Sequence, residues 1–286
     1  MPARLTVHPP ERASQFFVVP EEASRVLGRD PACDIVLDDA RVSKRHASLL
    51  WSEQGWTLAD LGSKNGTRIN GTPAPRLLRH GDWLSVGGVN AEFARLSLAQ
   101  LGAFERDHAR RRETSVGWGR ANSAEKSAAA LLRRLLQSSI ELTGTSRGFV
   151  LLLDAAGRLQ AEIASGFHRE AEAAAIFDGS RSVLERVRET RRTVVITDAQ
   201  ADAGLSGKPS ISLGGLRGLA AAPLRIEGAI RGFLYVDSQA PGTTISELDA
   251  EILEVLADQA AIALASLEID RQIRDLLNSV DGVSRG

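Results

Sequence analysis

Four residues that could bind an anion lie in or beside turns of the first third of the sequence. Arg29 and Lys44 supply charge-assisted hydrogen-bond donors, and Ser43 supplies a neutral hydroxyl donor. Asn65 carries both a donor and an acceptor, which suits the backbone of a bound peptide. No positioned nucleophile and base and no metal-binding cluster accompany them in the sequence. These residue types predict binding of a phosphorylated peptide rather than its chemical conversion.

The segment that must position these residues, 1–96, has the pattern of short strands joined by turns. Apolar residues alternate in short runs, as at Ala47, Leu49 and Trp51, and stretches such as PACD, GSKNG and INGTPAP separate the runs. This pattern predicts an all-β sandwich. The loops of a sandwich gather at its two ends, so we expect the polar residues to meet there.

The same segment carries four short motifs in order. They are Gly28-Arg29, Ser43 followed by His46, Asn65-Gly66-Thr67 and Asn70-Gly71. Together they resemble the forkhead-associated (FHA) domain, and the resemblance covers roughly residues 5–96. One of these motifs alone is a weak signal, whereas the ordered set is specific.

The resemblance implies a role for each matching residue. Arg29 and Ser43 match residues that bind the phosphate, and Lys44 occupies the basic position that follows. Asn65 matches the asparagine that binds the main chain of the ligand. Lys64 stands where some members have a threonine that reaches the phosphate, which weakens one contact and adds a charge. The residues implied to support the site are Gly28, His46, Gly66 and Thr67.

Some interpretations of this segment stay open. The domain could be a degenerate one that no longer binds phosphate, although every key position is present. Arg41, Arg45 and Arg68 are interpreted as solvated loop charges that could tune the flanking preference. Cys33 lies in the PACD turn and is interpreted as a residue without a redox role.

Residues 125–286 alternate helical and strand-like patterns. We expect a helix at 125–142 capped by Ser123, a strand pair at RGFVLLLD and RLQAEIAS, a second helix, three more strands and a long C-terminal helix. This order predicts an α+β fold, an antiparallel sheet with flanking helices on one face. The phrases RSVLERVRETRRTVVITDA, LAAAPLRIEGAIRGFLYVDS and LDAEILEVLADQAAIALAS resemble a GAF domain, which implies a small-ligand sensor and dimerisation module.

The sequence does not identify a ligand for the GAF-like region. The cyclic-nucleotide signature of that family is missing, the region has no cysteine for bilin attachment, and His168 is its only histidine. Asp198 and Asp237 end strands and are interpreted as capping or turn residues. No cluster of His, Asp and Glu has the spacing of a metal site. We expect no cofactor and no metal, and the ligand stays unknown.

The long C-terminal helix has two apolar faces. It can pack on its own sheet with one face and on a partner helix with the other. We predict a parallel homodimer through the helices at 125–142 and 247–277, with a seam that includes Ile252, Val255, Ile262 and Ile269; the alternative is one broad core face within a single chain. The full stripe follows a 4,3 alternation through Leu248, Ile252, Val255, Gln259, Ile262, Ser266, Ile269, Ile273 and Leu276.

Residues 97–124 form the predicted linker, and only its first half has a helical pattern. The run from Arg110 to Arg112 precedes Thr114, which makes Thr114 a candidate phosphosite for a basophilic kinase. Two glycines that follow suggest a mobile segment. Phosphorylated Thr114, captured by the first domain of the same chain, would form an autoinhibitory switch. The alternative is a solvated basic linker.

Composition narrows the class of protein. The chain has 286 residues, with 35 Lys and Arg against 36 Asp and Glu, and a single cysteine. The balanced charge argues against binding of nucleic acid or an anionic membrane. One cysteine excludes an internal disulfide framework, and the N-terminus has no signal-peptide pattern, so we expect a cytoplasmic protein.

We interpret the chain as a phosphothreonine-dependent signalling adaptor that binds a Ser/Thr-phosphorylated protein. It would consist of a phosphopeptide-binding domain at 1–96, a linker at 97–124 and a sensor or dimerisation domain at 125–286. One alternative is a regulatory fragment of a larger transcription activator or cyclase without its output domain, and another is a small-molecule sensor with a degenerate FHA domain. Walker A, GxSxG, HExxH and CxxC motifs are missing, so we expect no enzymatic activity.

Overall fold

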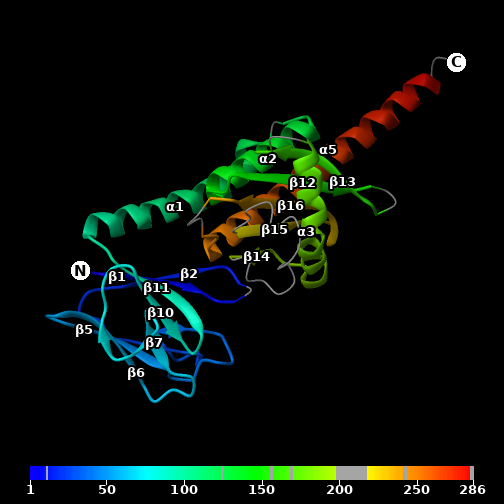
Figure 1. Cartoon of the computed structure of the whole chain (residues 1–286). Coiled ribbons are helices and arrows are strands. Elements are labelled where there is room, and N and C mark those ends of the chain that lie inside the picture. Colours follow the sequence, from blue (N-terminus) through cyan, green and yellow to red (C-terminus); the bar gives the residue numbers. More distant parts are fainter. Residues whose placement is uncertain are drawn as a thin grey trace. The chain divides into compact units, whose positions relative to one another are not determined.

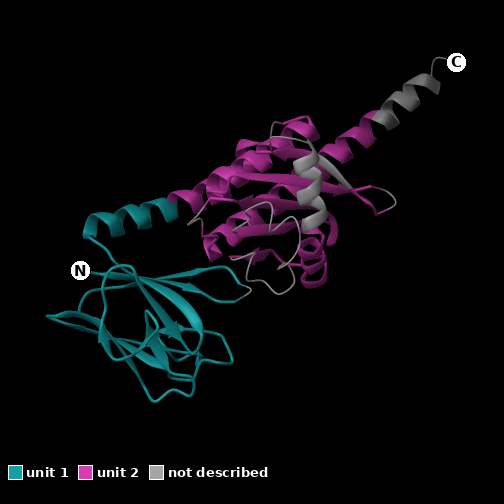
Figure 2. Ribbon diagram, viewed as in Figure 1, with its two compact units in different colours: residues 1–109 teal, residues 110–286 magenta. Residues whose placement is uncertain are grey.

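The chain folds into two compact units, Met1–Ala109 and Arg110–Gly286 (Figure 2). The computed structural model describes residues 1–10, 12–123, 125–154, 157–167, 170–197, 218–240 and 244–283. Within these ranges the side chains of 160–162, 170–179 and 275–283 are not described. In the described part of the chain, no helix is both long and apolar enough to cross a membrane.

The first unit is built from short strands. They are β1 (Ala3–His8), β2 (Gln15–Val19), β3 (Arg25–Gly28), β4 (Ile35–Val36), β5 (Ala47–Ser52), β6 (Gly55–Asp60), β7 (Thr67–Ile69), β8 (Thr72–Pro73), β9 (Arg76–Leu77), β10 (Asp82–Val86) and β11 (Val89–Arg95). One sheet has the order β2-β1-β11-β10-β7-β8 and the other the order β4-β3-β5-β6-β9 (Figure 1). Pairing is antiparallel, except that β3 and β4 run parallel.

These two sheets enclose one apolar core. Alternate residues of a strand point to the same side, so the period-2 pattern of the sequence places one set inside. Leu5, Phe93 and Leu84 come from one sheet, and Leu49 and Leu58 from the other, and all five are buried in the same cluster. The predicted all-β sandwich is confirmed.

The second unit contains one antiparallel sheet with the order β13-β12-β16-β15-β14. Its strands are β12 (Arg147–Leu153), β13 (Leu159–Ser165), β14 (Val194–Ile196), β15 (Gly218–Ile226) and β16 (Ala229–Ser238). Its helices are α2 (Ala128–Thr143), α3 (Glu170–Thr190) and α5 (Glu247–Val283). The predicted α+β class is confirmed.

Helices cover both faces of this sheet, so the prediction that they lie on one face is wrong. Phe149 and Tyr235 cluster with Val183 and Val187 of α3 on one side. The intervening residues of the same strands point the other way, to the side covered by α2 and α5 (Figure 1). The run FVLLL already pointed to this arrangement, because a strand buried on both faces reads as a continuous apolar run.

Helix α2 begins later than predicted. Its N-cap is Ser127, whose Oγ accepts a hydrogen bond from the Ala130 N–H (3.4 Å), and Gly144 ends it in the left-handed conformation at φ 67°. Ser123, the predicted cap, instead donates through Oγ to the Arg120 carbonyl (2.9 Å). The cap prediction is therefore wrong by four residues.

The predicted linker is almost entirely the helix α1 (Leu98–Ala121). Within the first unit, Phe104 of this helix makes an edge contact with Phe16 (centroids 5.5 Å apart). Within the second unit, Trp118 is buried and donates through Nε1 to Ser138 Oγ (3.0 Å). The expectation of a mobile second half is wrong, because packing and hydrogen bonds hold that half as a helix.

The apolar stripe of α5 divides into a covered and an exposed part. Ile252 is 1% exposed and belongs to the core of its own chain, so its place in the predicted seam is wrong. Val255 is half-buried. Farther along, Ile262 and Ile269 are 68% and 56% exposed, and Ile273 is exposed as well.

Candidate functional site

Three loops at one end of the sandwich carry the residues that the motifs single out. Arg29 directly follows β3, Ser43 and Lys44 precede β5, and Lys64 and Asn65 lie between β6 and β7. Backbone hydrogen bonds join the first two loops: the Arg29 N–H donates to the Ser43 carbonyl (3.1 Å) and the Asp30 N–H to the Lys44 carbonyl (3.2 Å). Residues far apart in the sequence thus share one site.

Gly28 permits the close approach of these two loops. A Cβ atom at this position would overlap the backbone carbonyl of Lys44 and would crowd the Sγ of Cys33 (2.9 Å). Cys33 itself is buried and donates through Sγ to the same carbonyl (3.1 Å). Any larger residue at 28 would therefore push Lys44 out of the site.

The third loop contacts the second through Ser43. The Lys64 N–H donates to Ser43 Oγ (3.1 Å), which leaves the hydroxyl hydrogen of Ser43 for an incoming oxygen. The Asn65 side chain donates through Nδ2 to the Arg41 carbonyl (2.6 Å). Its Oδ1 is thereby oriented to accept a hydrogen bond from a peptide N–H.

The buried His46 links the second loop to the third. It is fully buried; its Nδ1 accepts from the Ser43 N–H (2.9 Å), and its Nε2 lies 3.1 Å from the Gly66 carbonyl. A ring nitrogen that accepts from an amide carries no proton, so the proton of a neutral ring is on Nε2, which donates to Gly66. One imidazole thereby sets the spacing between the two loops.

Asp60 and Ser63, which lie outside the four sequence motifs, order the third loop. Asp60 accepts hydrogen bonds from Ser63 Oγ and Thr67 Oγ1 (2.6 Å each) and from the N–H groups of Gly62 and Ser63 (2.9 Å each). Burial alone would raise the pKa of the Asp60 carboxyl, but these hydrogen bonds outweigh it and lower the pKa from 3.8 to about 2. The signal in the sequence was an Asp with Gly and Ser two and three positions later, the pattern of an Asx turn.

Arg41 is exposed, as expected of a solvated loop charge, and it also helps to hold the loop. Its guanidinium donates through Nε and Nη2 to the two oxygens of Asp39 (2.9 and 2.8 Å). The hydrogen bond from Arg41 lowers the pKa of the Asp39 carboxyl. A Cβ at Gly87, whose φ is 60°, would lie 2.7 Å from the Arg41 carbonyl, so Gly87 also maintains this loop.

The remaining cations of the site are available to a ligand. Arg29, Lys44 and Lys64 are exposed. In the described part of the chain none of the three forms a salt bridge. Three positive charges around one hydroxyl and one amide form a small cationic surface that suits a dianion on a peptide.

The second unit holds a buried ion pair at the end of its sheet. Arg147 Nε donates to Asp237 Oδ1 (2.6 Å), and both side chains are almost fully buried. Burial raises the pKa of the neighbouring Tyr235 well above its ordinary value, and the Asp237 carboxylate raises it further. Asp237 is therefore an ion-pair partner rather than a turn residue, whereas Asp198 and His168 lie outside the described residues.

Two family models match the chain. A model described as the FHA domain matches residues 25–87, and one described as the GAF domain matches residues 125–265. The chain therefore contains an FHA domain followed by a GAF domain, and the predicted resemblance is confirmed.

Curated relatives match the FHA region only in part of their length. An oxoglutarate dehydrogenase inhibitor of Corynebacterium efficiens is 35% identical over 85 residues, which are 29% of this chain and 58% of the relative. The glycogen accumulation regulator GarA of Mycobacterium tuberculosis is 37% identical over 85 residues, 29% of this chain and 51% of the relative. The chain thus spans little more than half the length of these relatives.

Solved structures of FHA domains also match. One, from a structural and functional analysis of phosphothreonine-dependent FHA domain interactions, is 28% identical and covers 34% of this chain and 100% of that chain, with a TM-score of 0.32. The FhaA FHA domain in complex with the intracellular domain of Rv3910 is 29% identical and covers 32% of this chain and 98% of that chain, with a TM-score of 0.29.

Proposed function

We propose that the protein is a signalling adaptor that binds a phosphothreonine-containing protein through its FHA domain. The observation that carries this proposal is the meeting of Arg29, Ser43 and Asn65 on three loops that hydrogen bonds hold together. The matched relatives are named as an inhibitor and as a regulator, which supports a regulatory role.

The geometry suggests how a phosphopeptide would be held. Arg29 and Lys44 neutralise the phosphate, and the Ser43 hydroxyl donates to one of its oxygens. Asn65 Oδ1 accepts from a backbone N–H of the peptide, which fixes the position of the phosphorylated residue. Lys64 adds a charge where a neutral hydroxyl would otherwise reach the phosphate, so recognition relies more on electrostatics here.

The test measures binding of a phosphothreonine peptide library and of the same unphosphorylated peptides to the full chain. We expect a preference for the phosphorylated form. Arg29→Ala should weaken binding by about 1.5–3 kcal/mol, the range for a hydrogen bond to a charged group. Arg79→Ala removes an equal exposed charge from the turn before β10, at the opposite end of that strand from the site loops, and should leave affinity nearly unchanged. Equal binding of phosphorylated and plain peptides by the unmodified protein would refute the proposal.

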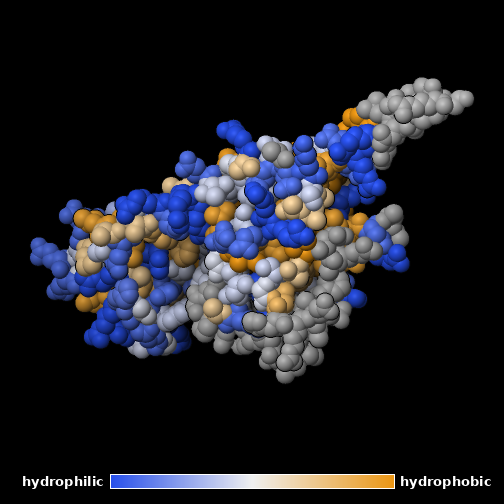
Figure 3. Space-filling model, turned by 90° about the horizontal axis from the view of Figure 1, so that it is seen from above, coloured by the Kyte–Doolittle hydropathy of each residue, from blue (hydrophilic) through white to orange (hydrophobic). Residues whose placement is uncertain are grey.

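For the GAF domain we propose a sensory and dimerisation role, with the dimer formed through the exposed part of α5. Ile262, Ile269 and Ile273 recur at spacings of seven and four residues, so they form one stripe along the helix. The space-filling view shows hydrophobic surface on α5 beside its grey C-terminal end (Figure 3). A second copy of the same helix is the partner that this repeat fits best, because the heptad spacing matches itself.

A further inference from the structure

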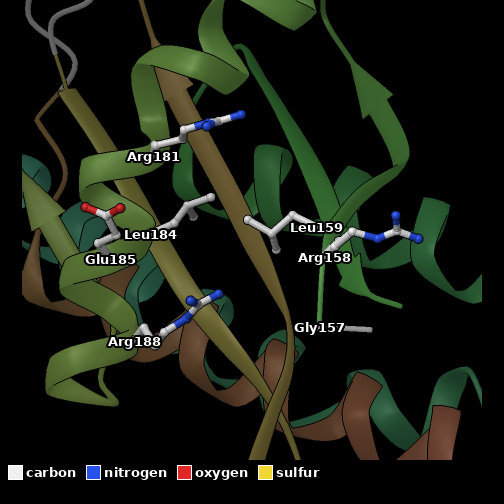
Figure 4. A pocket seen from close by; sticks show the side chains of 7 residues that line it. All are labelled: Gly157, Arg158, Leu159, Arg181, Leu184, Glu185 and Arg188. Carbon is white, nitrogen blue, oxygen red and sulfur yellow. The ribbon is translucent and has the colours of Figure 1, made fainter. Parts of the chain in front are cut away.

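A cavity of about 340 Å³ opens between the start of β13 and helix α3 in the second unit (Figure 4). Its lining combines an apolar floor with an arginine-rich rim. The lining residues are Gly157, Arg158, Leu159, Arg181, Leu184, Glu185 and Arg188.

The cavity lies at the rim of the contact between α3 and the sheet because the centre of that contact is filled. Val183, Val187, Phe233 and Tyr235 are all buried there in one apolar cluster. Leu184 and Leu159 continue this cluster to the cavity, where they point toward one another across its floor (Figure 4). A molecule bound in the cavity would therefore contact the short apolar surface formed by Leu159 and Leu184.

Two arginines of α3 border that surface. Arg181 and Arg188 both extend from the helix toward the strand that carries Leu159 (Figure 4). They are seven residues apart, so they share a helix face and are separated by about 10 Å along its axis. Arg158 lies on the opposite side of the cavity, just before β13, and its Nε is 2.9 Å from Asp154 Oδ2.

The described lining of the cavity carries the guanidinium groups of Arg158, Arg181 and Arg188 and the carboxylate of Glu185, and Asp154 compensates Arg158 from outside the lining. In Figure 4 the Glu185 carboxylate points away from the floor, whereas Arg181 and Arg188 point across it. The guanidinium groups of Arg181 and Arg188 thus border the apolar floor at two points, and their spacing favours an anion that is charged at both ends.

We propose that this cavity binds a small organic molecule with an acidic group at each end and an apolar body between them. The two acidic groups pair with Arg181 and Arg188, and the body lies on Leu159 and Leu184. The volume suits such a ligand, because small-molecule pockets start at about 300 Å³. This inference extends the proposed sensory role of the GAF domain and uses no residue of the phosphopeptide site.

The probe is suberate, a straight-chain dicarboxylate, titrated into the full chain by calorimetry. Its monomethyl ester has nearly the same length but one charge fewer. We expect saturable binding of suberate that is about tenfold tighter than that of the ester, since one arginine contact is lost. Arg181→Gln and Arg188→Gln should each weaken suberate binding about tenfold. Glu185→Gln should strengthen it, because a nearby negative charge is removed.

Arg192→Gln is the matched control, because Arg192 is an exposed arginine just beyond α3 that does not line the cavity. It should bind suberate as the unmodified protein does. Equal weakening in Arg192→Gln and Arg188→Gln, or equal affinities for suberate and its ester, would overturn the proposal. Phosphopeptide affinity is measured on the same variants and should not change, so failure of the cavity proposal and failure of the adaptor proposal are distinguishable.

Discussion

Asp60 holds the loop that presents Lys64 and Asn65 in one conformation. Its two oxygens accept four hydrogen bonds, from two backbone N–H groups and two hydroxyls. Because the donors lie within seven residues of the acceptor, the loop is ordered locally before any ligand arrives. A site ordered in advance loses less conformational entropy on binding.

At this scale we predict the effect of Asp60→Asn on stability. The pKa of Asp60 is about 2 in the folded protein and 3.8 ordinarily, so the charged carboxylate stabilises the fold. We expect the variant to lose about 1–2 kcal/mol in free energy of unfolding near neutral pH. The stabilisation is fully present above the ordinary pKa and is lost as the pH falls through the folded pKa. The difference in free energy of unfolding between the unmodified protein and Asp60→Asn should therefore shrink as the pH falls from 3.8 to about 2.

Urea unfolding followed by tryptophan fluorescence measures this gap, because three of the four tryptophans, Trp51, Trp56 and Trp83, lie in the first unit. Glu53→Gln, an exposed acid in the turn between β5 and β6, is the control and should change stability little. A difference in free energy of unfolding that stays constant down to the pKa of Asp60 in the folded protein would mean that Asp60 does not stabilise the loop through its charge.

At the scale of elements, helix α1 is held on α5 by polar contacts. Gln259 of α5 donates through Nε2 to the carbonyls of Ser115 (3.2 Å) and Val116 (3.1 Å) and accepts from the Gly119 N–H. Arg112 pairs with Glu251 (3.0 Å), and Arg111 pairs with Asp249. One glutamine thus satisfies backbone groups of a neighbouring helix, which requires a glycine at the point of approach.

Two glycines of α1 provide a matched pair of variants. Nothing lies within 4 Å of a Cβ at Gly117, so Gly117→Ala should raise stability by about 0.5–1 kcal/mol through helix propensity. A Cβ at Gly119 would lie 2.8 Å from Gln259 Oε1. Gly119→Ala should therefore displace Gln259 and lower the thermal midpoint despite the same gain in propensity. Equal midpoints for both variants would argue against the Gln259 contact.

The predicted autoinhibitory switch through Thr114 required a flexible linker, and the structure has a helix there. Thr114 is exposed, but it lies inside α1 rather than in a mobile tether, and Ser115 beside it is buried. Arg111 and Arg112, which were to attract a kinase, are already paired with carboxylates of α5. The prediction that a flexible linker lets the first domain capture phosphorylated Thr114 of the same chain is therefore wrong. Phosphorylation of Thr114 itself stays a prediction.

The exposed stripe of α5 gives a prediction about assembly. Ile262→Asp or Ile269→Asp should convert a dimer into a folded monomer, since each buries a charge in the proposed seam. Gln272→Asp adds the same charge outside the isoleucine stripe and should leave the dimer intact. Sedimentation velocity with circular dichroism separates dissociation from unfolding. An unmodified protein that sediments as a monomer at tens of micromolar would contradict the dimer.

At the scale of the whole molecule, a dimer would carry two FHA domains and would bind two phosphorylated sites at once. A peptide with two phosphothreonines on a long flexible linker should bind the unmodified protein at least tenfold more tightly than Ile262→Asp, because the second contact becomes intramolecular. A peptide with one phosphothreonine should bind both proteins equally. Calorimetric titration with both peptides free in solution measures both, and equal binding of the doubly phosphorylated peptide would exclude the avidity effect.

The sequence alone was sufficient for features that depend on local pattern. Alternating apolar residues predicted the sandwich, the ordered motifs around Arg29, Ser43 and Asn65 predicted the FHA domain, and the phrases of the second region predicted the GAF domain. Each of these signals is contained in a short stretch of chain, because strand periodicity and turn chemistry are set by neighbouring residues.

Only the tertiary structure decided which polar groups face one another. Arg41 pairs with Asp39, Arg147 pairs with Asp237, and Gln259 bonds the backbone of α1, and the last two of these contacts join residues 90 or more positions apart. The helical second half of the predicted linker depends on contacts of the same long-range kind, because neither its own apolar pattern nor its glycines favour a helix. The same holds for the isoleucine stripe: its spacing was visible in the sequence, but packing decided that Ile252 lies in the core and Ile262 on the surface.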